Sequence, residues 1–310
     1  MNNQKIAIIG ECMVELRSTG EMLAQNFGGD TLNTALYLAR LTQNANLATH
    51  YVTALGHDPF SSNMKAKWQS EGVHTENVLH IEGKQPGLYY IETDDTGERS
   101  FYYWRNDAAA KYLFEQADSN GLIQSLLTFD AIYLSGISLA ILTDESRVVL
   151  FDVLTQFKQA GGKVIFDNNY RPTLWQSKAK ALESYQAMLK LTDIACLTFE
   201  DEQALFGDDE VEQCITRTQA AGVTEIVIKL GCEPCLVITP EERISVAATR
   251  VEKVVDTTAA GDSFSAGYLA KRLTGGTPQE SAQAGHILAG TVIQYAGAII
   301  PTAAMPNLSI

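Results

Sequence analysis

Short apolar runs that end in a glycine or a polar residue alternate with helix-like segments along most of this chain. Strands that alternate with helices indicate a mostly parallel sheet covered by helices on both faces. We therefore predict an α/β fold with three layers, α/β/α. The predicted strands are Lys5–Glu11, Tyr51–Gly56, Ala131–Ser135, Lys163–Asp167, Asp193–Thr198 and Glu225–Lys229. The predicted helices begin near Gly28, Asp58, Asp144, Ala179, Val211, Ala260 and Pro278, and short β segments are expected over Cys235–Thr249.

One region breaks this alternation. Gly87–Thr93 and Glu98–Trp104 have strand-like composition and flank the turn-forming Asp94–Gly97. Two such runs around a glycine-containing turn predict a β-hairpin. The hairpin is rich in aromatic residues, so we expect a small antiparallel sheet that serves as a lid or an interface. Large exposed apolar patches usually mark interfaces, and the hairpin therefore predicts a homodimer.

Charge and cysteine content exclude several classes of function. The net charge of −14 argues against broad nucleic-acid binding and against anionic membrane surfaces. An anionic substrate would need a local basic pocket. The five scattered cysteines are typical of reduced thiols, and Cys232 and Cys235 alone offer too few ligands for zinc. Met1–Lys5 leads directly into a strand rather than a signal-peptide core, and no apolar run reaches about 18 residues, so we expect a cytoplasmic protein.

Polar residues gather where predicted strands end. Asp167–Pro172 and Thr198–Asp201 each follow a strand, Gly231 follows another, and Asp262 comes after the strand-like Val254–Val255. Ligands of open α/β sheets bind at the carboxyl ends of the strands. Each cluster alone is a common turn, but four together predict a binding site at this edge of the sheet.

The stretch Asp256–Gly267 carries the chemistry of this predicted site. Small residues let the backbone approach a ligand, and a helix that begins near Ala260 points free N–H groups at an anion such as phosphate. Asp262 lies in the first turn of that helix. A carboxylate there often only caps the helix. Beside an anion site, it is also the base that phosphoryl transfer to an alcohol requires.

The same stretch resembles the Asp-Thr-x-Gly/Ala-Ala-Gly-Asp signature of the ribokinase (PfkB-type) sugar kinases. Gly28–Asn33 resembles the family's Gly-Gly-x-x-x-Asn motif, and Asp167–Arg171 resembles its Asp-x-Asn-x-Arg motif. Thr198–Asp201 departs from the Asn-x-x-Glu element at both ends, and Gly231–Pro234 lacks the second glycine of the nucleotide loop. The resemblance spans the whole chain and implies one ribokinase-like domain over residues 1–310, with β-lid segments at about 11–28 and 86–106.

The resemblance also implies roles for individual residues, with ATP and Mg²⁺ as cofactors. Catalytic roles fall to Asp262, Gly261, Ala260, Ala259 and Arg171. Substrate binding falls to Gly29, Asp30, Asn33, Tyr89, Tyr103, Arg105, Asp167, Asn169, Arg171 and Asp262. Nucleotide binding falls to Thr198, Lys229, Gly231, Ala260, Gly261 and His286, and Asp201 acts on Mg²⁺ indirectly, through a water. The use of a monovalent cation is left open.

Within the family, the aromatic hairpin and Asp167–Trp175 resemble the 2-keto-3-deoxygluconate kinases. Such a substrate is a sugar acid, and Arg105 and Arg171 suit a carboxylate or a phosphate because guanidinium binds both bidentately. Three alternatives stay open: a neutral-sugar kinase of the fructokinase or ribokinase type, a nucleoside kinase, and a catalytically silent sugar-binding module. The sequence contains no Walker-type Gly-x4-Gly-Lys-Ser/Thr loop, which disfavours a P-loop enzyme.

Overall fold

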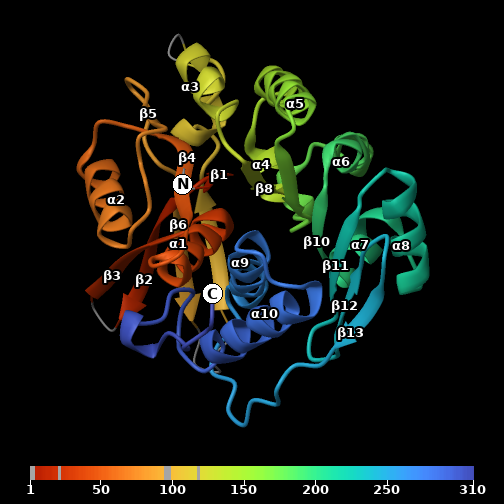
Figure 1. Cartoon of the computed structure of the whole chain (residues 1–310). Coiled ribbons are helices and arrows are strands. Elements are labelled where there is room, and N and C mark those ends of the chain that lie inside the picture. Colours follow the sequence, from red (N-terminus) through yellow and green to blue (C-terminus); the bar gives the residue numbers. More distant parts are fainter. Residues whose placement is uncertain (1–3, 20–21, 94–98, 117–118) are drawn as a thin grey trace.

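A large sheet of nine strands forms the centre of the protein, as a computed structural model of residues 4–19, 22–93, 99–116 and 119–310 shows (Figure 1). Seven of its strands run parallel, and the two at one edge pair antiparallel. In sheet order the strands are β13 (Arg243–Val246), β12 (Cys235–Ile238), β11 (Glu225–Lys229), β10 (Ile194–Thr198), β9 (Lys163–Asp167), β8 (Ala131–Ser135), β1 (Gln4–Ile9), β4 (Leu47–Leu55) and β5 (Val78–His80).

Both faces of this sheet are buried under helices. In β1, Ile6 and Ile8 pack into one hydrophobic core, whereas Ala7 and Ile9 pack into another. Successive side chains of a strand point to opposite faces, so the two cores lie on opposite sides and the three-layer prediction is confirmed. The first core is closed by α1 (Asp30–Thr42), α2 (Pro59–Ser70), α9 (Ala260–Leu273) and α10 (Pro278–Val292). The second is closed by α3 (Ser119–Leu126), α4 (Gly136–Ile141), α5 (Asp144–Gln159), α6 (Lys178–Leu191), α7 (Phe199–Phe206) and α8 (Val211–Ala220).

A second, smaller sheet stands beside the first. In sheet order it contains β3 (Met22–Gly28), β2 (Met13–Thr19), β6 (Leu88–Thr93) and β7 (Arg99–Trp104). The two outer pairings are antiparallel, as predicted, and β2 pairs with β6 in parallel. The predicted turn Asp94–Gly97 lies outside the described residues. Large apolar side chains are exposed on both edge strands of this sheet: Met22, Leu23, Phe101, Tyr102, Tyr103 and Trp104.

One predicted strand is wrong. Val254 and Val255 belong to no strand, and both are about half exposed. The backbone N–H of Val255 donates instead to the carbonyl of Ile293, just past α10, at 2.8 Å. Two adjacent valines have strand propensity, but this segment runs along a helix end rather than along the sheet. Asp262 therefore enters the site from the start of a helix and not from the end of a strand.

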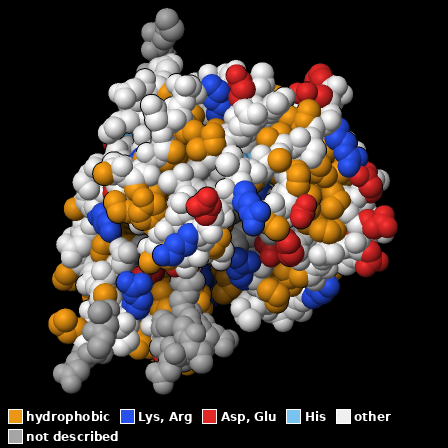
Figure 2. Space-filling view, turned by 90° about the horizontal axis from the view of Figure 1, so that it is seen from below, with side chains coloured by type: hydrophobic (Ala, Val, Ile, Leu, Met, Phe, Trp, Pro, Cys, Tyr) orange, Lys and Arg blue, Asp and Glu red, His pale blue; other side chains and the backbone are white. Residues whose placement is uncertain are grey.

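The helices of the described ranges give no candidate for a transmembrane segment, since none combines the required length with sufficient hydropathy. On the face that Figure 2 shows, Lys and Arg side chains are spread across the middle and acidic side chains gather along one edge.

Candidate active site

The N-terminus of α9 has the backbone geometry of an anion site. Ala259 has a left-handed backbone (φ 61°), which turns the chain into the helix. The N–H of Ala260 is already donated to the carbonyl of Thr257 at 3.1 Å. The N–H groups of Ala259, Gly261 and Asp262 have no acceptor among the described residues. These three amides, rather than that of Ala260, are the donors left for a ligand.

Asp262 has the chemistry of a general base. Its Oδ2 accepts a hydrogen bond from Asn33 Nδ2, in α1, at 2.8 Å. Burial, and then the negative charge of Asp30, raise the pKa of Asp262 to about 7, against the opposing hydrogen bond from Asn33. A base works best when its pKa lies near the working pH, so this carboxyl is suited to take a proton near neutrality.

A cavity of about 680 Å³ lies beside Asp262, between the small sheet and the large one. Every residue predicted to bind substrate lines it: Gly29, Asp30, Asn33, Tyr89, Tyr103, Arg105, Asp167, Asn169, Arg171 and Asp262. The motif glycine at its wall is required by close packing, because a Cβ on Gly29 would lie 2.2 Å from the backbone oxygen of Glu11. We call this space the sugar cavity.

A second cavity of about 660 Å³ lies on the other side of the α9 N-terminus. The predicted nucleotide-binding residues all line it: Thr198, Lys229, Gly231, Ala260, Gly261 and His286. Apolar side chains such as Val251, Phe264 and Ile293 form much of the remaining wall. A largely apolar cleft with a few polar groups is typical of a small-molecule site. We call this space the nucleotide cavity.

The two cavities share one wall, to which four residues belong: Thr198, Lys229, Ala260 and Gly261. Lys229, at the end of β11, is the charged member of this set. Its Nζ donates to Asp167 Oδ2 at 2.9 Å, and both side chains are buried. A group that moves from one cavity to the other would pass the α9 amides and this lysine.

Two arginines predicted to bind an anion are already paired with carboxylates. Arg105, just after β7, forms a buried ion pair with Glu11. Arg171 is half exposed and lies 3.5 Å from Asp201 through its Nη1. The sequence reasoning missed Glu11, although it directly follows Gly10 at the carboxyl end of β1 and the strand-end rule applies to it as well.

Asn168 is a second residue that the sequence reasoning missed. It is fully buried, and its side-chain oxygen accepts the N–H groups of Asn169 and Thr198, each at 2.9 Å. Its amide nitrogen donates to Glu202 Oε1 at 2.8 Å. Asn169, held in a left-handed backbone (φ 27°), donates in turn to Asp30 at 2.7 Å. Asn168 thus ties the end of β9, on the sugar side, to the end of β10, on the shared wall.

The predicted magnesium residue has a donor set that suits an indirect role. Asp201 Oδ2 accepts the N–H of Tyr170 at 3.1 Å, and its other oxygen faces Arg171. Burial raises the pKa of Asp201, while Arg171 lowers it. Carboxylate oxygen is the ligand type that Mg²⁺ prefers, and Mg²⁺ usually keeps several of its waters. Since both oxygens already have protein partners, contact through a water fits this carboxylate best.

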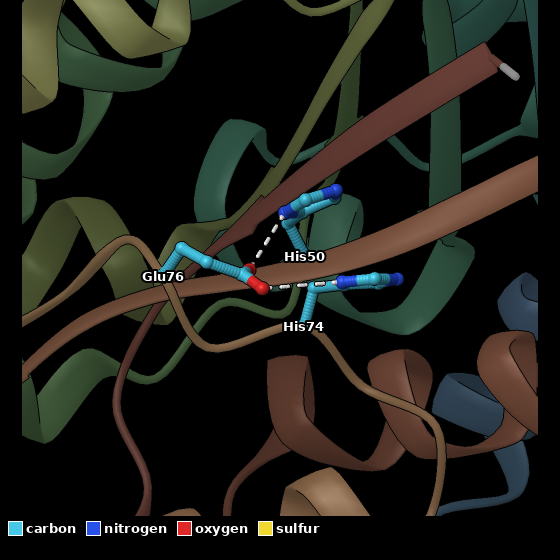
Figure 3. Close-up of side chains that lie close together, drawn as sticks. All are labelled: His50, His74 and Glu76. Carbon is cyan, nitrogen blue, oxygen red and sulfur yellow. Dashed lines mark hydrogen bonds and ion pairs between the residues drawn. The ribbon is translucent and has the colours of Figure 1, made fainter.

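A cluster of His50, His74 and Glu76 lies outside the two cavities (Figure 3). Each histidine places its Nδ1 3.4 Å from a different oxygen of the Glu76 carboxylate. The imidazole rings are stacked, with centroids 4.4 Å apart and planes at 19°. Lone pairs of stacked rings run side by side, whereas a metal ion needs ligands that converge on it. The cluster is two imidazoles that share one carboxylate, and it does not have the geometry of a metal centre.

Comparison with known proteins agrees with this site. Residues 3–305 match the model of the pfkB family carbohydrate kinases. The chain belongs to the pfkB family of carbohydrate kinases. It is 58% identical to a 2-dehydro-3-deoxygluconokinase of Dickeya dadantii, over 99% of this chain and 100% of the relative. It is 56% identical to a 2-dehydro-3-deoxygluconokinase of Escherichia coli, over 98% of this chain and 99% of that relative.

A solved structure of a putative ribokinase II from Escherichia coli, in complex with ATP and Mg²⁺, has the same fold. The TM-score is 0.82 at 20% sequence identity, and the match covers 98% of this chain and 96% of that one. The ribokinase-like fold predicted from the sequence is therefore confirmed, and so is the assignment of the chain to the carbohydrate kinases.

Proposed function

We propose that this kinase transfers the γ-phosphoryl group of ATP to the C6 hydroxyl of 2-keto-3-deoxygluconate, which is the 2-dehydro-3-deoxygluconate of the relatives' names. The observation that carries the chemistry is the position of Asp262 in the sugar cavity, directly after Gly261 of the wall that this cavity shares with the nucleotide cavity. The substrate assignment draws on the two relatives with 58% and 56% identity. A carboxyl with a pKa of about 7 beside that wall matches the need for a base.

In the proposed reaction, Asp262 accepts the proton of the C6 hydroxyl as its oxygen attacks the γ-phosphorus. A positioned base of this kind contributes typically about 10²–10⁴-fold. The N–H groups of Ala259, Gly261 and Asp262 stabilise the charge that develops on the phosphoryl oxygens, and loss of one comparable donor costs roughly 3–4 kcal/mol in other enzymes. Arg171 supplies a mobile cation at the sugar side, because its side chain is half exposed.

Mg²⁺ fits this arrangement through the Asp201 carboxylate and an intervening water. When bound, it would neutralise negative charge on the phosphates. Asn168 fixes the position of Thr198 at the shared wall, and Gly231 and His286 line the far part of the nucleotide cavity. These residues orient ATP with its phosphates toward the start of α9.

A neutral-sugar kinase is the second candidate, and one observation favours it. Arg105, the cation expected to bind a sugar-acid carboxylate, is already neutralised by Glu11. A site with a paired arginine has no obvious surplus of positive charge for an anion. A neutral hexose would leave this ion pair intact.

A coupled ADP-release assay over sugars and sugar acids separates these candidates. Turnover of 2-keto-3-deoxygluconate far above that of fructose and ribose is the expected result, and preference for a neutral hexose would contradict the substrate assignment. In the same assay Asp262→Asn should lose most of kcat while its affinity for the sugar acid changes only a few-fold. Near-normal turnover by this variant would refute the role of Asp262.

We also propose that residues 1–310 act as one kinase domain, with the small sheet as a lid over the sugar cavity, and that two copies associate through this sheet. The supporting observation is the set of exposed apolar side chains on β3 and β7. Light scattering should give the mass of a dimer for the wild type. Leu23→Lys together with Trp104→Lys should give the mass of a monomer, and a wild-type monomer would contradict the proposal.

A further inference from the structure

The cations that line the sugar cavity among the described side chains are engaged before any substrate arrives. There are three, and each pairs with a carboxylate: Lys229 with Asp167, Arg171 with Asp201 and Arg105 with Glu11. Asp30 and Asp262 line the same cavity in addition. The anion of a sugar acid would therefore enter a site with excess negative charge. It must separate one of these ion pairs to obtain a counterion.

Of these three pairs, Arg105–Glu11 is the one whose cation has a buried donor left unpaired. The Arg105 side chain is 10% exposed, and its guanidinium makes a single hydrogen bond among the described residues, through Nη2 to Glu11. Its Nε is buried without an acceptor. A buried donor without a partner is unfavourable, so Arg105 gains from a further carboxylate acceptor. Tyr103, a predicted substrate ligand, places its ring 6.0 Å from the guanidinium carbon.

Separation of this pair leaves Glu11 in an environment that disfavours its charge. The Glu11 side chain is only 2% exposed. A Cβ on Gly87 would lie 2.9 Å from Glu11 Oε1, so the backbone of the small sheet closes over the carboxyl. Without Arg105, the charged or titratable groups that face Glu11 are Asp30 at the start of α1, Cys12 beside it and Tyr51 in β4, and none of them is a cation.

We propose that Glu11 is a specificity-determining residue for the sugar acid: when the substrate carboxylate pairs with Arg105, Glu11 leaves the ion pair and takes up one proton from solvent. This inference rests on the proposed function, because it assumes an anionic sugar. A buried carboxylate without a counterion takes a proton rather than stay charged. Burial already raises the pKa of Glu11, Arg105 opposes that shift, and Asp30 adds to it. The proton keeps the net charge of the cavity unchanged when the anion binds.

Calorimetry of sugar-acid binding tests this directly. Binding of 2-keto-3-deoxygluconate without ATP is measured at pH 7 in buffers of different ionisation enthalpy, which gives the number of protons taken up. The background is Asp262→Asn, which removes the other carboxyl that titrates near neutrality. Uptake of a large fraction of one proton is expected in this background. The added substitution Glu11→Gln should abolish the uptake, and the matched control Glu71→Gln, in an arginine–glutamate pair that lines neither cavity, should leave it intact.

Persistence of the uptake in Glu11→Gln, or its absence in the Asp262→Asn background, overturns the inference. Glu11→Met serves in the same test if Glu11→Gln does not fold. A second readout is the dissociation constant: linkage requires that it rise by up to about tenfold per pH unit where the proton is taken up, and it should become flat in Glu11→Gln. A sugar acid that neither binds nor is turned over by the wild type defeats the proposed function and this inference together. Turnover without proton uptake defeats the inference alone.

Discussion

On the proposed mechanism, the hydrogen bond from Asn33 to Asp262 sets the pH at which this enzyme gains activity. Asn33 Nδ2 donates to Asp262 Oδ2 at 2.8 Å and lowers a pKa that burial and Asp30 raise to about 7. A hydrogen bond to a charged group contributes about 1.5–3 kcal/mol, which corresponds to roughly 1–2 pKa units. Asn33→Leu should therefore move the pKa of Asp262 to about 8–9. Because the ionised carboxyl is the base, the ionised fraction at pH 7 would fall by about 5- to 50-fold.

The assay is the pH dependence of kcat from pH 6 to 9.5, measured by ADP release. The sugar acid is kept saturating, because Asn33 also lines the sugar cavity. The acidic limb of Asn33→Leu should shift upward, and its kcat should approach that of the wild type at the alkaline end. Thr34→Val is the control, since the hydrogen bond from Thr34 to Asp262 goes to the backbone oxygen and not to the carboxylate. The acidic limb of this variant should stay in place. The reasoning would be refuted if Asn33→Leu lowered kcat by the same factor at every pH and left the midpoint of the acidic limb unchanged.

Three further predictions concern stability. The pKa of Asp262 in the folded protein lies above its usual 3.8. The contribution of this carboxyl to stability is therefore full below about pH 4 and is lost as pH rises through 7. Asp262→Asn should raise Tm at pH 8 and not at pH 4, with a gain on the order of 2–4 kcal/mol. Burial lowers the pKa of His50 to about 4, so the contribution of His50 to stability is full above pH 6.5 and is lost as pH falls through 4. The free energy of unfolding in urea should therefore be lower at pH 5 than at pH 7, and His50→Gln should reduce this difference. An unchanged difference would contradict the prediction. Gly29→Ala would place a methyl group against the backbone oxygen of Glu11. We expect the free energy of unfolding to fall by about 1–3 kcal/mol, with a lower Tm and lower activity. A wild-type Tm would contradict this prediction.

Most of the fold followed from local patterns in the chain. Each predicted strand of the parallel core and each predicted helix is present. A strand buried on both faces is a short apolar run, and a glycine or a capping residue indicates where the adjacent helix begins or ends. Asp58, for example, accepts the N–H of Ser61 at 3.1 Å and caps α2, where Pro59 had predicted a helix start. The strand predicted at Val254–Val255 is wrong because the β-propensity of two residues is a weak signal. Contacts with the end of α10 determine the conformation of this segment instead.

The site was predictable as a set of residues and not as a network. Motif positions gave the lining of both cavities, but pairing across the fold leaves no mark in a single sequence. Glu11 lies 94 positions from Arg105, and nothing local shows that the two side chains form an ion pair. Asn168 was visible inside a motif, yet its role depends on Glu202, which reaches it from α7. The sequence also did not show that the N–H of Ala260 is donated to the carbonyl of Thr257, because that hydrogen bond depends on the geometry of the turn.

The order of strands in the large sheet also bears on how the protein matures on the ribosome. From β8 to β13 each strand lies beside its predecessor in the chain, so the sheet can extend outward as synthesis proceeds. The chain then returns to the middle, where α9 packs against α1 and brings Asp262 to Asn33, 229 positions away. N-terminal parts of a chain generally fold first. On the proposed mechanism, a nascent chain that ends at β13 would thus have the small sheet and the other carboxylates of the sugar cavity, but neither the base Asp262 nor the phosphoryl-binding amides, so it could not consume ATP until α9 and α10 emerge.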